Sequence, residues 1–270
     1  MTRPDQTRPD QTRPDHYSAF YSDSFYEANQ SDKNYLSSRK VIELLKKYLT
    51  PKSVIDIGCG VGQFLRAFSD SGVENICGVD GFWVKDNMLL IPKECFVGYD
   101  LSQAGLINHI PEKHFDLTVS SEVAEHIDPC DVEAFMDNLT SFSDVILFSA
   151  AIPGQGGDHH VNEQWPSYWA EKFAARGFIA IDCIRPFIWA DSSIRTDYRQ
   201  NLIMFVKENA LDKYPALKHE AGRPVIDAVH NTLWEERHLS RYGFKKNCRN
   251  IFFGLLYLIP SFFRAVKKRL

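Results

Sequence analysis

The chain has 270 residues, of which 44% are hydrophobic and 13% aromatic. This composition supports a sizeable buried core and excludes a globally disordered protein. The formal net charge of −4 argues against a general nucleic-acid binder. The charge is uneven, because residues 237–270 contain nine Lys or Arg and no Asp or Glu. Residues 1–236 therefore hold 22 basic and 35 acidic residues, a net charge of −13.

The cysteines and the N-terminus indicate the compartment. No two of the six cysteines have C-x-x-C spacing, so the sequence predicts neither a zinc knuckle nor a redox dithiol and favours a reducing environment. The first residues contain no apolar stretch of the kind found in signal peptides. We therefore expect a cytoplasmic protein.

The first 50 residues divide into two parts. Residues 1–15 repeat Thr-Arg-Pro-Asp-Gln, and a proline at every fifth position blocks both helices and strands, so we predict a disordered tail. Residues 16–50 contain an aromatic stretch, followed by apolar residues at helical spacing over Asn34–Leu49. We expect this part to form N-terminal helices that cap the following domain.

Residues 51–207 alternate between short apolar runs and helical stretches. The runs predict seven strands, at Ser53–Ile57, Asn75–Val79, Cys95–Gly98, Phe115–Val119, Val145–Ser149, Phe178–Ile184 and Asn201–Val206. Helical spacing covers Gly62–Ser69, Phe82–Leu90, Ser102–Asn108, Asp131–Thr140 and Trp165–Arg176. This alternation predicts an α/β fold with a doubly wound, mostly parallel, seven-stranded sheet. The last two strands have no long helix between them, which indicates an antiparallel closure.

The most informative segment is the loop after the first strand. It reads Val-Ile-Asp-Ile-Gly-Cys-Gly-Val-Gly over residues 54–62 and leads directly into a helix. Glycines there let the backbone approach a ligand closely, and the first N–H groups of the helix can receive a polar or anionic group. The spacing fails the dinucleotide fingerprint G-x-G-x-x-G, because residue 63 is Gln. Asp80 ends the second strand, where a carboxylate can accept both hydroxyls of a ribose.

Two further loops bring titratable side chains to the same edge of the sheet. Glu122-Val-Ala-Glu125-His126 follows the fourth strand, and in the first turn of a helix Glu122 and His126 would be i,i+4 neighbours. A glycine-rich loop follows the fifth strand and carries Asp158, His159, His160 and Glu163. Ligands of such folds bind at this edge.

The C-terminal residues 208–270 are predicted to form a helical extension with a basic, apolar tail. Ile251–Phe263 would span roughly 20 Å as a helix, which is too short for a hydrocarbon core of ~30 Å. Basic residues flank this run, at Lys245, Lys246, Arg249, Arg264, Lys267, Lys268 and Arg269. The pattern is typical of a peripheral anchor on an anionic membrane surface. Packing of the run on its own domain is the alternative.

Four segments together resemble class I S-adenosylmethionine (SAM)-dependent methyltransferases. They are Val54–Leu65, Gly78–Gly81, Asp100–Leu101 and Phe115–Ile127, in the order and spacing of that family's motifs. The resemblance covers roughly residues 17–207 and implies a Rossmann-like methyltransferase domain that binds SAM. It places Asp80 on the ribose and Asp100 on the adenine amine.

The methionine end of SAM also has expected partners. Asp56 can order its amine, while N–H groups of the Gly58–Gly62 turn receive its carboxylate. The expected cofactor-binding residues are thus Asp56, Gly58, Cys59, Gly60, Gly62, Asp80, Gly81, Asp100, Leu101 and Ser120.

The E-x-x-E-H sequence resembles a motif of two further groups, the small-RNA terminal 2′-O-methyltransferases and the O-methyltransferases of ubiquinone synthesis. In both groups it holds a divalent cation. The resemblance implies that Glu122, Glu125, His126 and His160 hold Mg²⁺ or another divalent cation, with His159 as the alternative to His160. The motif is also common in class I methyltransferases with no reported metal. In that case His160 or His126, beside Glu125, would act as a general base.

The acceptor is predicted to be a hydroxyl group. Residues 152–206 are similar to bacterial methyltransferases found among sugar and surface-glycan enzymes, through His-Val-Asn-Glu-Gln-Trp-Pro-Ser-Tyr-Trp and the later Arg199-Gln-Asn201. This favours a sugar or glycan precursor, either a small molecule or a lipid-linked sugar, over a quinone or catechol. The charge of −13 disfavours RNA. A SAM-binding docking module without turnover is the competing class, and the intact Glu125, His126 and His160 favour the enzyme.

Overall fold

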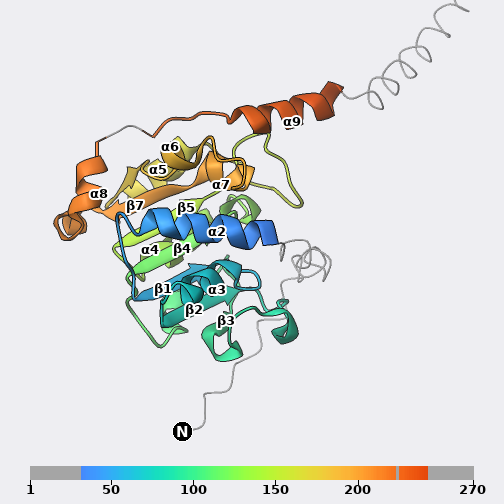
Figure 1. Ribbon diagram of the computed structural model, residues 1–270. Helices are drawn as coiled ribbons and strands as arrows, with labels where there is room; N and C mark the ends of the chain where they lie inside the picture. The colour runs from blue at the N-terminus through green and yellow to red at the C-terminus, as the bar shows by residue number, and fades with distance from the viewer. Residues whose placement is uncertain (1–31, 223–224, 243–270) are drawn as a thin grey trace, which may run out of the picture. The chain divides into compact units, whose positions relative to one another are not determined.

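Figure 1 shows the computed structural model, which describes residues 32–222 and 225–242. The chain divides into two compact units, one ending at Asp227 and the other beginning at Ala228. The described part of the second unit contains helix α9 (Asn231–Tyr242). The expected N-terminal repeat, residues 16–31 and the apolar, basic tail lie outside the described residues.

A seven-stranded sheet forms the centre of the first unit. Its strand order is β3-β2-β1-β4-β5-β7-β6, and every neighbouring pair is parallel except those that involve β7. The strands are β1 (Ser53–Ile57), β2 (Asn75–Asp80), β3 (Phe96–Gly98), β4 (Leu117–Ser121), β5 (Val145–Ser149), β6 (Phe178–Ile181) and β7 (Ile203–Lys207). This order confirms the predicted α/β fold, with its Rossmann-like, mostly parallel sheet and antiparallel closure.

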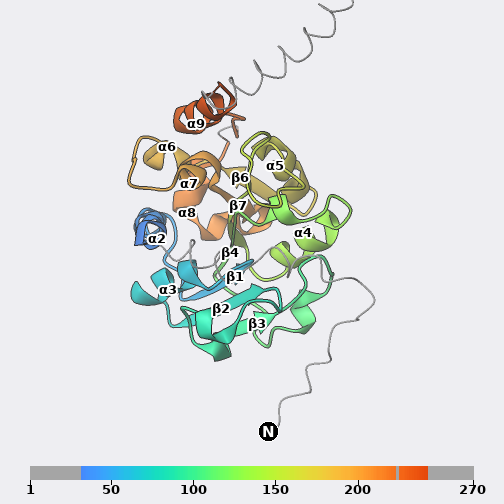
Figure 2. The ribbon, with the colours of Figure 1, turned by 90° about the vertical axis from the view of Figure 1, so that its right-hand side faces the viewer.

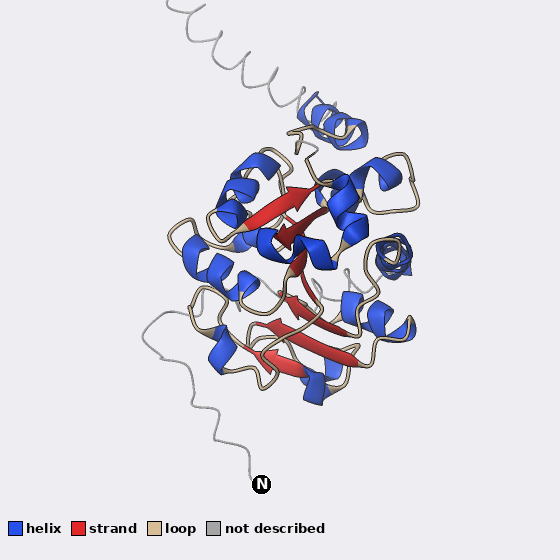
Figure 3. Cartoon of the chain, turned by 90° about the vertical axis from the view of Figure 1, so that its left-hand side faces the viewer, coloured by secondary structure: helices blue, strands red, loops and turns tan. Residues whose placement is uncertain are grey.

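Helices cover both faces of the sheet (Figures 2 and 3). On one face lie α2 (Asp32–Leu45) and α3 (Gln63–Asp70), which share a buried apolar cluster with Val54, Leu117 and Leu147. On the other lie α4 (Val132–Thr140) and α5 (Pro166–Ala174), which pack against alternate residues of the same strands. Successive side chains of a strand point to opposite faces, so strands buried on both sides read as continuous apolar runs.

Short helices occupy the remaining connections. Between β6 and β7 lie α6 (Arg185–Ile188) and α7 (Thr196–Asn201), and α8 (Pro215–Glu220) follows β7. Short 3₁₀ helices occur at Asp86–Met88, Lys93–Cys95, Leu106–Asn108, Ala124–His126 and Glu208–Lys213. No helix among the described residues is both long and apolar enough to cross a membrane.

Two predicted helices are wrong. Residues 82–90 contain only one 3₁₀ turn, because the N–H of Leu90 donates to the carbonyl of Val61 at 2.8 Å and holds the segment against the glycine loop. Residues 102–108 begin as a turn, because the Asp100 carboxylate accepts the N–H of Ser102 at 3.0 Å. Gly105, with φ of 96°, then precedes a second 3₁₀ turn.

The predicted sixth and seventh strands are also too long. The sixth ends at Ile181, because the Asp182 carboxylate pairs with the Arg185 guanidinium at 2.6 Å where α6 begins. Asn201 belongs to α7 rather than to the seventh strand.

We expect Phe148→Ala to lower the free energy of unfolding by about 3–5 kcal/mol. Phe148 is buried in β5, and its ring centroid lies 5.4 Å from that of Trp169 and 5.2 Å from that of Phe173. Urea denaturation measures the loss. The control is Phe187→Ala, because the Phe187 side chain is 57% exposed and should change stability by no more than ~0.5 kcal/mol. Equal effects of the two substitutions would contradict this packing.

Candidate functional site

A cavity of about 400 Å³ opens at the carboxyl ends of the parallel strands. The loops after β1 to β5 and the segment between β6 and β7 form its walls. Ligands of open α/β sheets bind at this edge, and the volume is typical of small-molecule sites. Eight of the ten expected cofactor-binding residues line the cavity: Asp56, Gly58, Cys59, Gly60, Asp80, Gly81, Asp100 and Leu101.

The glycine loop, residues 58–62, requires its glycines for backbone conformation and for packing. Gly58, Gly60 and Gly62 have φ of 85°, 55° and 86°, which other residues rarely adopt. A Cβ on Gly58 would lie 2.3 Å from Cγ2 of Val123, so the loop packs directly on the segment after β4. Gly62 was expected to contact the cofactor, but it faces Ile91 and does not line the cavity.

Asp80 connects β2 to the glycine loop. Its carboxylate accepts the N–H of Gly60 at 2.7 Å through one oxygen and the N–H of Gly81 at 2.7 Å through the other. Burial raises the pKa of Asp80 to about 6, although these two hydrogen bonds favour the ionised form. Burial and the nearby Asp80 charge raise the pKa of Asp56 well above its usual value.

The ends of β3 and β4 contribute Asp100 and Ser121 to the cavity wall. Asp100 lines the cavity, and its Oδ1 accepts the hydroxyl of Ser102 at 2.7 Å. Ser120 was expected to contact the cofactor, but its side chain is fully buried and it does not line the cavity. The next residue, Ser121, does. Consecutive strand residues face opposite ways, so here it is Ser121 rather than Ser120 that faces the cavity.

Glu122 lies on the cavity wall in an unusual backbone conformation, with φ of 56°. Its two carboxylate oxygens accept hydrogen bonds from two side-chain amides, Gln155 Nε2 at 2.9 Å and Asn201 Nδ2 at 3.0 Å. Burial raises the pKa of Glu122 to about 7, with the Asp197 charge as the next cause. The expected i,i+4 pair with His126 is absent, because only Ala124–His126 forms a 3₁₀ turn.

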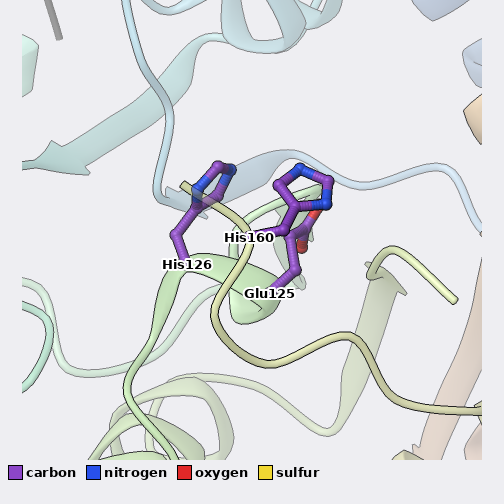
Figure 4. A group of neighbouring side chains, drawn as sticks. All are labelled: Glu125, His126 and His160. Atoms are coloured by element: carbon purple, nitrogen blue, oxygen red, sulfur yellow. The ribbon is translucent and has the colours of Figure 1, made fainter. Parts of the chain in front are cut away.

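Glu125, His126 and His160 all line the cavity, and Figure 4 shows their side chains close to one another. Each offers one ligand atom, and these atoms all lie within 4.8 Å of one another. Three of the four residues expected to ligate a metal are thus neighbours. Glu122 is not part of this group, since both of its oxygens face amides. Of the two candidate histidines it is His160, not His159, that joins the group.

The Glu125 carboxylate is completely buried, and among the described residues neither of its oxygens has a hydrogen-bond partner of good geometry. Burial, and then the charge of Glu122, raise the pKa of Glu125 well above its usual value; the N–H groups of Glu125 and Ala151 offset part of this rise. Burial, and then His160, lower the pKa of His126 to about 4, so its imidazole is neutral at physiological pH. An uncompensated buried carboxylate beside two imidazoles suits a divalent cation.

Glu163 orients His160. Its Oε1 lies 2.9 Å from His160 Nδ1, which leaves Nε2 as the ring nitrogen that can bind a metal or accept a proton. The same carboxylate accepts the N–H groups of Gly154, at 2.7 Å, and Gly156, so it also closes the loop after β5.

Several wall residues were not singled out as site residues from the sequence. Gln155, Arg195, Asp197 and Tyr198 line the cavity, and the buried Asn201 holds Glu122. Only the Arg199-Gln-Asn201 similarity pointed to this region. The other residues come from loops without a recognisable motif, and chain folding alone brings them to the cavity.

No curated protein matches the chain in sequence. Similar solved structures include the methyltransferase domain of bacterial CtHen1, with 21% identity, a TM-score of 0.47 and coverage of 65% of this chain and 98% of that one. The plantazolicin methyltransferase BpumL in complex with SAH has 15% identity, a TM-score of 0.48 and coverage of 70% and 93%. Human N-acetylserotonin methyltransferase in complex with SAM has 14% identity, a TM-score of 0.48 and coverage of 72% of this chain and 59% of that one.

One family comparison covers most of the first unit. Residues 29–181 match the family described as a methyltransferase domain. The matched segment includes the glycine loop, Asp80, Glu125, His126 and His160. Since it spans more than half of the 270 residues, the chain belongs to this methyltransferase-domain family.

Proposed function

We propose that this protein transfers the methyl group of SAM to a hydroxyl group. The supporting observation is that one cavity contains both the glycine loop with Asp80 and the Glu125–His126–His160 group. The glycine loop with Asp80 suits a nucleoside with a charged tail, and the group of one carboxylate and two imidazoles suits activation of a hydroxyl. A docking module without turnover would not need the carboxylate and the two imidazoles.

The residues of the chain have distinct roles in this proposal. Asp80 accepts the ribose hydroxyls, and Asp100 accepts the adenine amine. The glycine loop packs against the ligand without Cβ interference. The reaction forms an O–CH₃ bond, breaks the S–CH₃ bond and releases the hydroxyl proton. Because it is an in-line displacement, fixing the acceptor oxygen opposite sulfur supplies much of the acceleration.

We expect Asp80→Asn to weaken the binding of S-adenosylhomocysteine (SAH) by about 10- to 100-fold, because hydrogen bonds to a charged acceptor are lost. Only ionised Asp80 accepts from both hydroxyls, so wild-type affinity should also fall as pH drops through about 6. Asp80→Asn should lack this pH dependence. Titration calorimetry measures both effects. Asp86→Asn, an exposed carboxylate outside the cavity, is the control. Unchanged affinity in Asp80→Asn would remove Asp80 from the binding site.

We also propose that Glu125, His126 and His160 hold a divalent cation. A cation bound there would lower the pKa of an acceptor hydroxyl and fix its direction. The pKa of His126, about 4, supports this role over that of a general base, because so weak a base accepts a proton poorly near neutral pH. Glu163 would fix the ring of His160 for ligation.

Mn²⁺ binding, followed by calorimetry, should distinguish the two glutamates of the motif. We expect Glu125→Gln and His160→Ala to lose measurable binding, because each removes a ligand atom of the group. Glu122→Gln should retain it, since amides already satisfy that carboxylate. If Glu122→Gln also loses Mn²⁺ binding, Glu122 is a fourth metal ligand, as expected from the sequence. Absence of Mn²⁺ binding by the wild type, with full activity in excess EDTA, would eliminate the metal.

For the acceptor we propose a sugar or glycan precursor, with a quinone or catechol as the alternative. The proposal rests on the sequence similarity over residues 152–206. Trp165 is partly exposed and could stack on a sugar face, but it does not line the cavity. Trp169 is buried in the core and cannot do so. Two coordinated hydroxyls would require a vicinal diol, which sugars and catechols share. Methyl transfer from labelled SAM to extracted glycans and to catechols would separate these classes.

We propose that residues 245–270 attach the protein to an anionic membrane surface, on the basis of the basic residues that flank Ile251–Phe263. The full chain should float with anionic vesicles, whereas a chain of residues 1–244 should stay in the soluble fraction. Neutral vesicles provide the control. If the full chain fails to float with anionic vesicles, the attachment is wrong.

A further inference from the structure

A single guanidinium faces the cavity. Among the lining residues that the structure describes, Arg195 is the only Lys or Arg. Seven carboxylates share the same walls, from Asp56, Asp80, Asp100, Glu122, Glu125, Asp158 and Asp197. A cation so placed offers a specific partner to an anionic group of a ligand, because the rest of the wall repels one.

Arg195 is held in a defined orientation. Its Nε donates to both carboxylate oxygens of Asp197, at 2.9 and 3.0 Å, and its Nη2 donates to the same carboxylate. The guanidinium also lies over the ring of Tyr198, 5.1 Å from the centroid. Its backbone N–H donates to Ser37 Oγ of α2 at 3.0 Å. The N–H groups of Nη1 have no hydrogen-bond partner within residues 32–222 and 225–242, so they can receive a ligand.

The neighbours of Arg195 place it at the glycine-loop end of the cavity. The ring of Tyr198 lies 5.5 Å from that of Phe64, centroid to centroid. Phe64 is the second residue of α3, directly after the glycine loop, and both rings line the cavity. Arg195 thus lines the cavity next to the aromatic rings that follow the glycine loop.

Resting on the proposed function, the geometry points to Arg195 as the residue that binds the methionine carboxylate of SAM, with Asp197 holding the guanidinium in place. SAM has one carboxylate, and its ammonium and sulfonium groups suit the acidic walls. The loop N–H groups were expected to receive this carboxylate alone. A charge-assisted hydrogen bond from Nη1 adds a stronger and more directional contact.

The test compares SAH with its decarboxylated analogue, 5′-(3-aminopropylthio)-5′-deoxyadenosine, by titration calorimetry. We expect Arg195→Met to bind SAH about 10- to 100-fold more weakly than the wild type. The analogue should bind the two proteins with affinities within about threefold of each other, since it has no carboxylate to lose. Arg195→Lys should recover part of the SAH affinity.

Arg176→Met is the matched control, because Arg176 also pairs with carboxylates, of Glu133 and Asp137, but lies outside the cavity. Thermal unfolding confirms that each variant is folded. Equal SAH affinity of wild type and Arg195→Met would overturn the inference, and an accompanying loss of turnover would assign Arg195 to an acceptor carboxylate instead. If Arg195→Met loses affinity equally for SAH and for the analogue, the inference is also overturned, because the substitution then affects the glycine loop in general. Failure of the wild type to bind SAH would refute the proposed function itself.

Discussion

Four carboxylates lie at the carboxyl edge of the sheet, with Asp56 and Glu125 buried and Asp80 and Glu122 partly buried, and the arrangement of the cavity follows from the free energy required to keep them there. Removing a carboxylate from water disfavours its ionised form, and a second carboxylate nearby adds to this effect. Burial is accordingly the largest cause of the raised pKa of Asp56, Asp80, Glu122 and Glu125. Backbone N–H groups compensate Asp80, and side-chain amides compensate Glu122. Within the part of the chain that the structure describes, Glu125 has no comparable partner.

A site with this imbalance is suited to ligands that carry positive charge. A sulfonium, an ammonium and a divalent cation would each relieve the repulsion between the buried carboxylates, so their binding would be coupled to the ionisation of the walls. Arg195 supplies part of this compensation within the protein itself, since its charge lowers the pKa of Glu122. The carboxylates that lower the stability of the protein without ligand would thus favour the binding of cationic ligands. Such a trade-off between stability and function is common.

The sequence predicted the sheet and the glycine loop because both depend on local patterns. The limits of β1 and β5 were predicted correctly, since each is an apolar run bounded by turn residues. The helix predicted over residues 82–90 failed because a tertiary hydrogen bond, from Leu90 to Val61, overrides the local periodicity. The role of Glu122 was predicted for a helical conformation, but its φ is 56°, and its carboxylate accepts hydrogen bonds from amides of the loop after β5 and of α7. No local pattern reports such contacts.

The antiparallel closure of the sheet explains how the segment between β6 and β7 reaches the cavity. Because β7 runs antiparallel to both β5 and β6, β6 is parallel to β5 and ends at the same edge. The connection from β6 to β7 therefore starts and finishes at the carboxyl edge rather than crossing to the opposite one. Its short helices α6 and α7 keep it there, and they bring Arg195, Tyr198 and Asn201 beside residues of β1 and β4. A parallel seventh strand would need a crossover and would leave this wall open.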